Sequence, residues 1–295
     1  MTSPGWRIAK LVAVLAIIVW SLGPILIGVS TSLSTQREVN AIPTRWVPHH
    51  PTLQAYHDLL GGTSNQRAGG TVTEAGTFTR SIYNSAILSA VSTSFILIFA
   101  TMAAYAVGRL RFRLGGAVLA LLVGTMIVPI FVVVVSLFKV LAEPPVGPSL
   151  IDTKGGLVLV FIATLTPLAT WLLYTQVREM PTEPEEAALI DGCSPLRMLY
   201  RVMLPLVMPG IITIGLFAFF NAWNELFAAL IYLTDSDKYT LPLLLATART
   251  NPGLFGGTNW GGLQASVTIT MVPCLLLFMF LQRYYVSGLT GGAVK

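Results

Sequence analysis

Six long stretches of this chain contain no charged residue, and this feature limits the possible folds more than any other. The stretches cover residues 11–33, 82–107, 114–138, 155–177, 202–224 and 263–282. Each reaches the roughly 20 residues that a helix needs to cross the hydrocarbon core of a bilayer. Alternating ten-residue barrel strands are absent from the sequence, and in lipid an isolated helix satisfies all its own backbone hydrogen bonds. We therefore expect an all-α polytopic membrane protein, with six transmembrane helices in a single transmembrane domain over residues 1–295.

The composition supports this class. Hydrophobic residues make up 54% of the chain and charged residues 11%, compared with about 25% charged in average soluble domains. These values exclude a cytoplasmic globular enzyme, a disordered protein and a small disulfide scaffold. The net charge of +5 is first interpreted as loop charge that sets orientation, and we expect no nucleic-acid partner. Cys193 and Cys274 show no metal-type spacing, so two free thiols are expected.

Lysine and arginine positions predict the orientation. With the N-terminus inside, the predicted cytoplasmic segments hold most of the basic residues outside the long first loop: Arg7, Lys10, Arg109, Arg111, Arg113, Arg178, Arg197, Arg201, Arg283 and Lys295. Residues 34–80 then form an external loop, 178–205 a cytoplasmic loop and 285–295 a cytoplasmic tail. The basic edge at 109–113 is interpreted as an anchor to anionic lipid of the bilayer. The first run exceeds a signal-peptide core of about 7–15 residues and carries Trp20 and Pro24, so we expect it to be retained.

The cytoplasmic loop contains the sharpest local signals. Thr182 and Glu185 have the spacing of a capping box, with Pro184 in the first turn of the predicted helix. Gly192 has the position of a helix stop, and Ser194 should cap a second helix that ends at Leu204-Pro205. This segment is either a docking element for a partner or a solvated linker between two spans.

The order of residues in this loop is similar to the EAA loop of ABC importer permeases. Glu186-Ala187-Ala188, then Gly192, then Val202, Leu204 and Pro205 follow the family spacing throughout. Two more stretches resemble the carbohydrate branch: residues 80–85 (RSIYNS) at the start of the second run, and 221–225 (NAWNE) in the fifth. The tail 282–295 resembles that of the second permease subunit of maltose-type, or type I, systems. The Gly-rich stretch 61–77 departs from the family and looks like an insertion.

The resemblance implies a permease subunit of an ATP-driven importer for a carbohydrate or related polar solute, in a bacterial or archaeal inner (plasma) membrane. It implies as partners a second permease, a dimer of ABC ATPase subunits that hold ATP and Mg²⁺, and an external solute-binding protein. This chain itself would hold no cofactor and catalyse no reaction. Coupling to the ATPase would fall to Glu186, Ala187, Ala188, Asp191, Gly192, Leu204 and Pro205. Contact between the cytoplasmic tail and the ATPase would fall to Gly288, Thr290, Gly292 and Lys295.

Polar residues at the end of the fifth run form a second candidate site. Asn221, Asn224 and Glu225 have the spacing of one helical face, and an ionisable residue within a span usually faces a cavity or a partner. We expect a translocation cavity or gate here, with structural contact between helices as the alternative. Whether these residues contact the solute stays open.

Other sequence patterns define the alternatives. His49, His50 and His57 match no compact zinc spacing, so no metal site is expected. Neither a phosphate-binding G-x-x-x-x-G-K-[ST] motif nor a hydrolase or zinc-protease motif occurs. A membrane-embedded enzyme of the glycosyltransferase kind would have to rely on Asp235 and Asp237. A receptor or scaffold that transports nothing is the other alternative. The identity of the solute is beyond the sequence.

Overall fold

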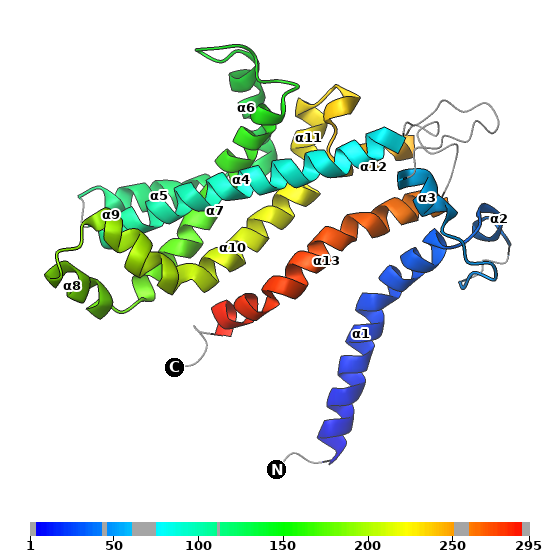
Figure 1. Ribbon diagram of the computed structural model, residues 1–295, viewed down its shortest axis with the longest axis horizontal. Helices are drawn as coiled ribbons and strands as arrows, with labels where there is room; N and C mark the ends of the chain where they lie inside the picture. Colours follow the sequence, from blue (N-terminus) through cyan, green and yellow to red (C-terminus); the bar gives the residue numbers. More distant parts are fainter. Residues whose placement is uncertain (1–3, 43–45, 61–74, 111–112, 251–259, 291–295) are drawn as a thin grey trace. The chain divides into compact units, whose positions relative to one another are not determined.

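The computed structural model describes residues 4–42, 46–60, 75–110, 113–250 and 260–290, and every regular element in these ranges is helical (Figure 1). Five of these helices are long and apolar enough to cross a membrane: Gly5–Ser32, Thr77–Arg109, Lys154–Glu179, Leu196–Asn224 and Trp260–Gln282. They coincide with five of the six charge-free runs. The all-α polytopic fold is therefore confirmed.

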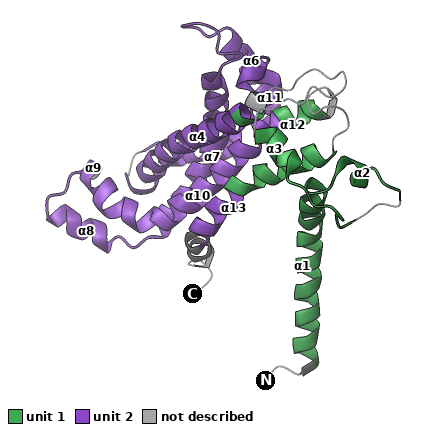
Figure 2. Cartoon of the chain, turned by 45° about the vertical axis from the view of Figure 1, so that its right-hand side comes forward, with its two compact units in different colours: residues 1–79, 244–273 green, residues 80–243, 274–295 purple. Residues whose placement is uncertain are grey.

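The chain divides into two compact units, which Figure 2 colours separately. Unit 1 comprises residues 1–79 and 244–273, and unit 2 comprises residues 80–243 and 274–295. Unit 1 contains α1 (Pro4–Ser32), α2 (Gln36–Val39) and α3 (Gln54–Leu60). Three helices have residues in both units: α4 (Ala75–Arg109), α12 (Leu241–Thr250) and α13 (Trp260–Thr290).

Helix α1 exposes apolar side chains on all sides. Val19 is 71% and Trp20 85% exposed, and Pro24 lies within the helix. A surface of this kind is suited to lipid or to a partner helix. The connection after α1 is ordered by Glu38, which forms a capping box with Thr35 and accepts hydrogen bonds from the backbone N–H groups of His49 and His50.

Unit 2 is built around α7 (Lys154–Glu179), which contributes to two hydrophobic cores. The remaining elements of this unit are α5 (Gly115–Thr125), α6 (Ile130–Ala142), α8 (Glu183–Ile190), α9 (Pro195–Met198), the π turn η1 (Leu199–Met203), α10 (Leu204–Asn224), α11 (Phe227–Tyr232) and η2 (Ser236–Lys238). One core gathers Leu157 and Phe161 of α7 with residues of α4, α6 and α11. The second gathers Leu173 and Val177 of α7 with residues of α4, η1 and α10. Because both cores share α4 and α7, these helices form the frame of unit 2.

The third charge-free run is not one straight helix, contrary to the prediction. Helices α5 and α6 meet at an angle of 100°, and α6 stands away from α5 in Figure 1. Between them Met126, Ile127 and Val128 form tight turns, and Pro129 follows. Proline lacks the N–H that would continue the ladder of α5, and its ring disfavours helical backbone in the preceding residue. The run therefore forms either a broken span or a re-entrant pair.

Candidate functional site

Helix α8 begins in the predicted place, but its first turn is stabilised differently. Thr182 lies at the N-cap and Pro184 in the first turn, yet the Thr182 side chain makes no capping hydrogen bond. The predicted capping box is therefore wrong. Glu185 instead extends to Arg109, the last residue of α4, with 2.8 Å between Oε1 and Nε. An arginine from a distant helix attracts the carboxylate more strongly than a neutral backbone N–H does.

The same contact corrects the role of Arg109. The side chains of Arg109 and Glu185 are each only 12% exposed, so this arginine does not reach lipid headgroups as predicted. Its Nη2 also donates to the carbonyl of Met180, at 2.8 Å. Of the other two basic residues, Arg113 is exposed and Arg111 lies outside the described residues.

Gly192 ends α8, as predicted. Its φ of +75° lies in the left-handed region that glycine adopts at little cost. Asp191 is the C-cap. The N–H of Cys193 donates to the carbonyl of Ala188 at 2.9 Å, and that of Gly192 donates to Leu189 at 3.0 Å. These two bonds form a Schellman motif, which turns the chain sharply after the helix.

The second helix begins as predicted and continues further. The backbone N–H of Arg197 donates to the Ser194 hydroxyl at 3.4 Å, which confirms the cap. Leu204-Pro205 does not end the element, however, because helical backbone continues from Leu196 to Asn224. A π turn precedes Pro205, with the Leu204 N–H bonded to the Leu199 carbonyl. Proline in the first turn of α10 is compatible with this geometry because its missing N–H interrupts the α-helical ladder only locally.

The outer side of α8 is an apolar and acidic surface. Leu189 is 58% and Ile190 87% exposed, and Glu186 is also exposed. Ala188 is buried, so the small residues of the motif divide between the two sides of the helix. In Figures 1 and 2, α8 lies at the edge of unit 2, beyond α9. A short helix held at both ends with exposed aliphatic side chains is suited to docking in a groove of another protein.

The second candidate site is an open pocket of about 450 Å³ at the end of α10. It is lined by Phe220, Asn221, Asn224, Glu225, Leu226 and Phe227. The structure thus brings together the three residues singled out in the sequence. Each asparagine donates its amide to the carbonyl four residues earlier, Asn221 to Phe217 and Asn224 to Phe220, both at 2.8 Å. The amide oxygen of each asparagine is a further hydrogen-bond acceptor within a residue that lines the pocket.

Glu225 does not continue the helical face of the asparagines. Helix α10 ends at Asn224, and Glu225 has extended backbone with ψ of 120°. Its carboxylate accepts the N–H groups of Ala228 at 2.8 Å and Ala229 at 3.2 Å, so it caps the start of α11. The expectation of one continuous face is wrong because the helix ends at Asn224. The apolar sequence of residues 226–232 contains no stop signal that would reveal this end. The carboxylate nevertheless lines the pocket, with a capping role that the sequence analysis missed.

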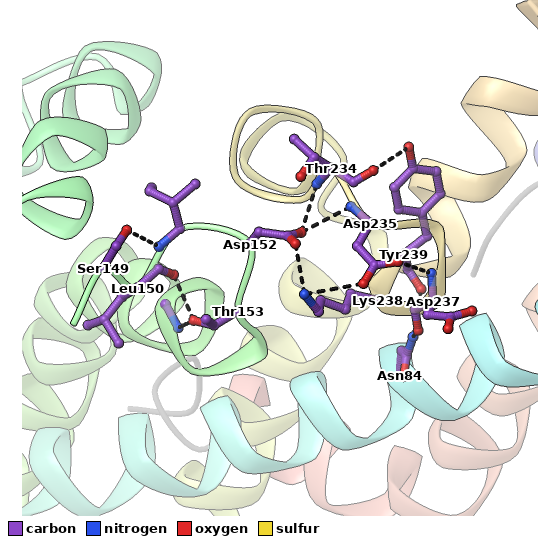
Figure 3. A network of polar contacts seen from close by, with 12 residues as sticks. Asn84, Ser149, Leu150, Asp152, Thr153, Thr234, Asp235, Asp237, Lys238 and Tyr239 are labelled. Carbon is purple, nitrogen blue, oxygen red and sulfur yellow. Dashed lines mark hydrogen bonds and ion pairs between the residues drawn. The ribbon is translucent and has the colours of Figure 1, made fainter.

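Charged side chains from three segments form a network near the start of α7 (Figure 3). Asp152 accepts the backbone N–H groups of Thr234 and Asp235, at 2.9 and 3.1 Å, and pairs with Lys238 at 2.7 Å. The contact with Lys238 is the main reason that the pKa of Asp152 falls to about 2. The alternative of an enzyme site relied on Asp235 and Asp237. Both form ion pairs instead, Asp235 with Lys238 and Asp237 with Arg80.

Asn84 of α4 also belongs to this network and is fully buried (Figure 3). Its amide nitrogen donates to the carbonyls of Asp237 and Tyr239, each at 3.0 Å, and its oxygen accepts from Lys154. The hydroxyl of Ser85 accepts the N–H of Leu241 at 2.7 Å. The stretch 80–85 thus holds the segment 237–241 in place. Asn84 was visible in the sequence as a polar residue in an apolar run, whereas no sequence signal identified Asp152.

Other predicted residues have simpler outcomes. Cys193 and Cys274 are free thiols. Across the described part of the chain, no three His, Cys, Asp or Glu side chains group in a way that could hold a metal ion. Of the predicted tail residues, Gly288 and Thr290 lie in the last turns of α13, and Gly292 and Lys295 lie outside the described residues. Within the Gly-rich stretch 61–77, residues 61–74 also lie outside the described residues.

Comparison with known families gives one match over most of the chain. The profile of the family described as "Binding-protein-dependent transport system inner membrane component" matches residues 76–291. This range begins with α4 and ends after α13, so it contains α8 and its surroundings, the pocket and the charged network.

Several named permease proteins are similar to this chain. The sulfoquinovosyl glycerol permease SmoH of Agrobacterium fabrum is 29% identical over 300 residues, covering all of this chain and 98% of SmoH. The diacetylchitobiose permease DasC of Streptomyces coelicolor is 34% identical, covering 76% of this chain and 79% of DasC. The trehalose/maltose permease MalG of Thermococcus litoralis is 31% identical, covering 72% and 74%.

A solved structure shares the fold. It is a bacterial ABC transporter involved in import of the acidic polysaccharide alginate, with a TM-score of 0.75 and 21% identity. The match covers 97% of this chain and 99% of that one.

Proposed function

Because this chain belongs to the family of inner membrane components of binding-protein-dependent transport systems, it is the permease subunit of an ABC importer, and we propose how it works and with which partners. It is not catalytic, since its relatives are named as permeases. The solute is a carbohydrate or a related polar molecule. This part of the proposal rests on relatives named for sulfoquinovosyl glycerol, diacetylchitobiose and trehalose or maltose.

The partners follow from the importer type. They are a second permease, a dimer of ATPase subunits that bind ATP and Mg²⁺, and an external solute-binding protein. The bacterial alginate transporter, a structural relative, has been solved with a solute-bound periplasmic protein. Both termini and residues 178–205 face the cytoplasm, and residues 34–80 face outward, which rests on the positions of lysine and arginine.

The observation that carries the mechanism is the construction of α8. Its outer side presents Glu186, Leu189 and Ile190, while the Gly192 turn connects it to the continuous helix that becomes α10. Docking of an ATPase subunit on this side would move α8 when the ATPase dimer closes. The ATPase would then bind one conformation of the permease better than the other, and so favour it. Alternating access requires such a difference in binding.

Reconstitution tests this function. The chain is produced with its partner permease and ATPase, inserted in vesicles, and supplied with the solute-binding protein and labelled di- and oligosaccharides. We expect ATP-dependent uptake of a saccharide and co-purification of the ATPase. A chain that binds the ATPase without moving any solute would instead be a receptor or scaffold.

Labelling with a membrane-impermeant thiol reagent tests the orientation. In a variant that lacks Cys274, a new cysteine at Ser64 should react in intact cells, while the native Cys193 of the cytoplasmic loop should react only after permeabilisation. Reaction of Cys193 in intact cells would contradict the topology.

A further inference from the structure

We infer that Arg109 is a positioning residue for energy coupling, through which movement of α8 reaches α4 directly as well as α10. This inference rests on the proposed function, in which α8 receives the movement of the ATPase. It concerns contacts within this chain, at the side of α8 that faces away from the proposed docking surface.

The guanidinium of Arg109 holds two points of the chain at once. Its Nη2 donates to the carbonyl of Met180, the residue that follows α7, at 2.8 Å. Its Nε lies 2.8 Å from Oε1 of Glu185, in the first turn of α8. One planar group therefore fixes both the segment entering α8 and the start of α8 itself. Arginine suits this task because its guanidinium is always charged and carries several N–H groups, so it can pair with a carboxylate and donate to a carbonyl at once.

The surroundings make this contact stronger than a surface ion pair. Both side chains are 12% exposed, so water screens the two charges only weakly. Nearby, Tyr105 of α4, Val177 of α7 and Met203 of η1 belong to one hydrophobic core. The contact between Nε and Oε1 is electrostatic rather than an aligned hydrogen bond, since neither atom has a hydrogen-bond partner. Charge on both side chains is therefore what holds them together.

The two ends of α8 thus have different attachments. Its C-terminal end passes through the Gly192 turn into α9, η1 and α10, which is a covalent connection. Its N-terminal end follows α7 through residues 180–182 and is also attached to α4, through Arg109 and Glu185. If the ion pair is lost, α8 stays connected to α10 and keeps its outer surface, but α4 is released from it. We therefore expect an assembled importer that hydrolyses ATP with less transport.

The test compares Glu185→Gln with Glu183→Gln in the complete reconstituted importer. Glu183 is exposed in the same turn of α8, so its neutralisation controls for lost charge near the ATPase. A second pair, Arg109→Lys and Arg109→Gln, separates charge from side-chain length. Each variant is measured for co-purified ATPase, for ATP hydrolysis with solute-loaded binding protein, and for uptake, all per assembled complex.

The expected result is a change in the ratio of uptake to ATP hydrolysis. Glu185→Gln and Arg109→Gln should lower this ratio about tenfold, within the usual range of coupling free energies between sites. Glu183→Gln should leave it unchanged, and Arg109→Lys should recover a large part of it. An unchanged ratio in Glu185→Gln, or equal ratios in the two Arg109 variants, would overturn the inference. So would a loss of uptake that only follows a loss of assembled complex. Absence of uptake in the unmodified importer would contradict the proposed function instead.

Discussion

Arg109 at the end of α4 and Glu185 at the start of α8 form an ion pair, with 2.8 Å between Nε and Oε1, although α5, α6 and α7 lie between them in the sequence. This contact joins one helix of the unit 2 frame to α8, the helix that exposes Glu186, Leu189 and Ile190.

Gly192 should not accept a side chain without cost. Nothing lies within 4 Å of the position of a Cβ, so the cost comes only from the φ of +75°. We expect Gly192→Ala to destabilise the turn by roughly 1–2 kcal/mol and to weaken uptake. Gly192→Pro should abolish uptake while the chain still inserts, because proline also removes the N–H bonded to Leu189. Gly116→Ala is a matched control in open space at ordinary φ. Normal uptake in Gly192→Pro would show that the loop is only a linker.

Glu186→Lys should abolish coupling without disturbing α8. The side chain is exposed in the first turn, where a positive charge is unfavourable near the helix N-terminus by about 0.3–1 kcal/mol. That effect is too small to unfold a membrane protein, so loss of uptake would come from the docking surface. Co-purification of the ATPase is the measurement, and retained binding with normal uptake would contradict the prediction.

Gly210 provides close contact between α10 and α7. A Cβ there would overlap the amide of Gln176, so Gly210→Ala must displace this side chain. Because Gln176 is flexible, we expect a loss of about 1–3 kcal/mol rather than unfolding. Thermal unfolding in detergent should show this loss, and Gln176→Ala in the same chain should restore most of it. Gly124→Ala, with open space at the Cβ, is the control.

Two substitutions of Glu225 should separate its role as a cap of α11 from its role in the pocket. Glu225→Ala removes the acceptor of the Ala228 and Ala229 N–H groups and should cost about 1 kcal/mol of stability. We expect it to impair uptake more than assembly, because the carboxylate also lines the pocket. Glu225→Gln keeps one acceptor oxygen and should recover stability. If Glu225→Gln also recovers uptake fully, the capping role alone explains the effect, and the gate hypothesis is wrong.

The pair of Asp152 and Lys238 should make stability depend on pH only at the extremes. Since contact with Lys238 lowers the pKa of Asp152 from 3.8 to about 2, its stabilisation is fully present above 3.8 and is lost as pH falls through about 2. The pKa of Lys238 is raised by the same contact, so at high pH the pair persists beyond 10.5. Thermal unfolding of Asp152→Asn and the unmodified chain should therefore differ by a constant amount across neutral pH. Glu143→Gln, at the exposed acid that caps the C-terminal end of α6, is the control. A difference that varies between pH 5 and 8 would contradict this account.

The sequence predicted what depends on local chemistry. Five spans follow from the cost of exposing polar backbone to lipid, and the Gly192 turn and Ser194 cap follow from backbone preferences of a few residues. Contacts between distant segments were not predictable in this way. The capping box at Thr182 failed because Arg109 competes for Glu185. The bend near Pro129 had a local signal, but apolar composition indicates that a segment prefers lipid and not which direction it takes.

Because of the π turn at Leu199–Met203, the number of residues in this segment sets the rotation of α8 about the axis of α10 as well as its distance from α10. A π turn contains an extra residue, and each residue of a helix rotates the chain by about 100°. Deleting one residue here would convert the π turn to regular α-helix before Pro205, yet it would turn α8 and its exposed Leu189 and Ile190 around the axis of α10. Such a chain would fold and insert, but the side of α8 proposed to dock on the ATPase would face another direction.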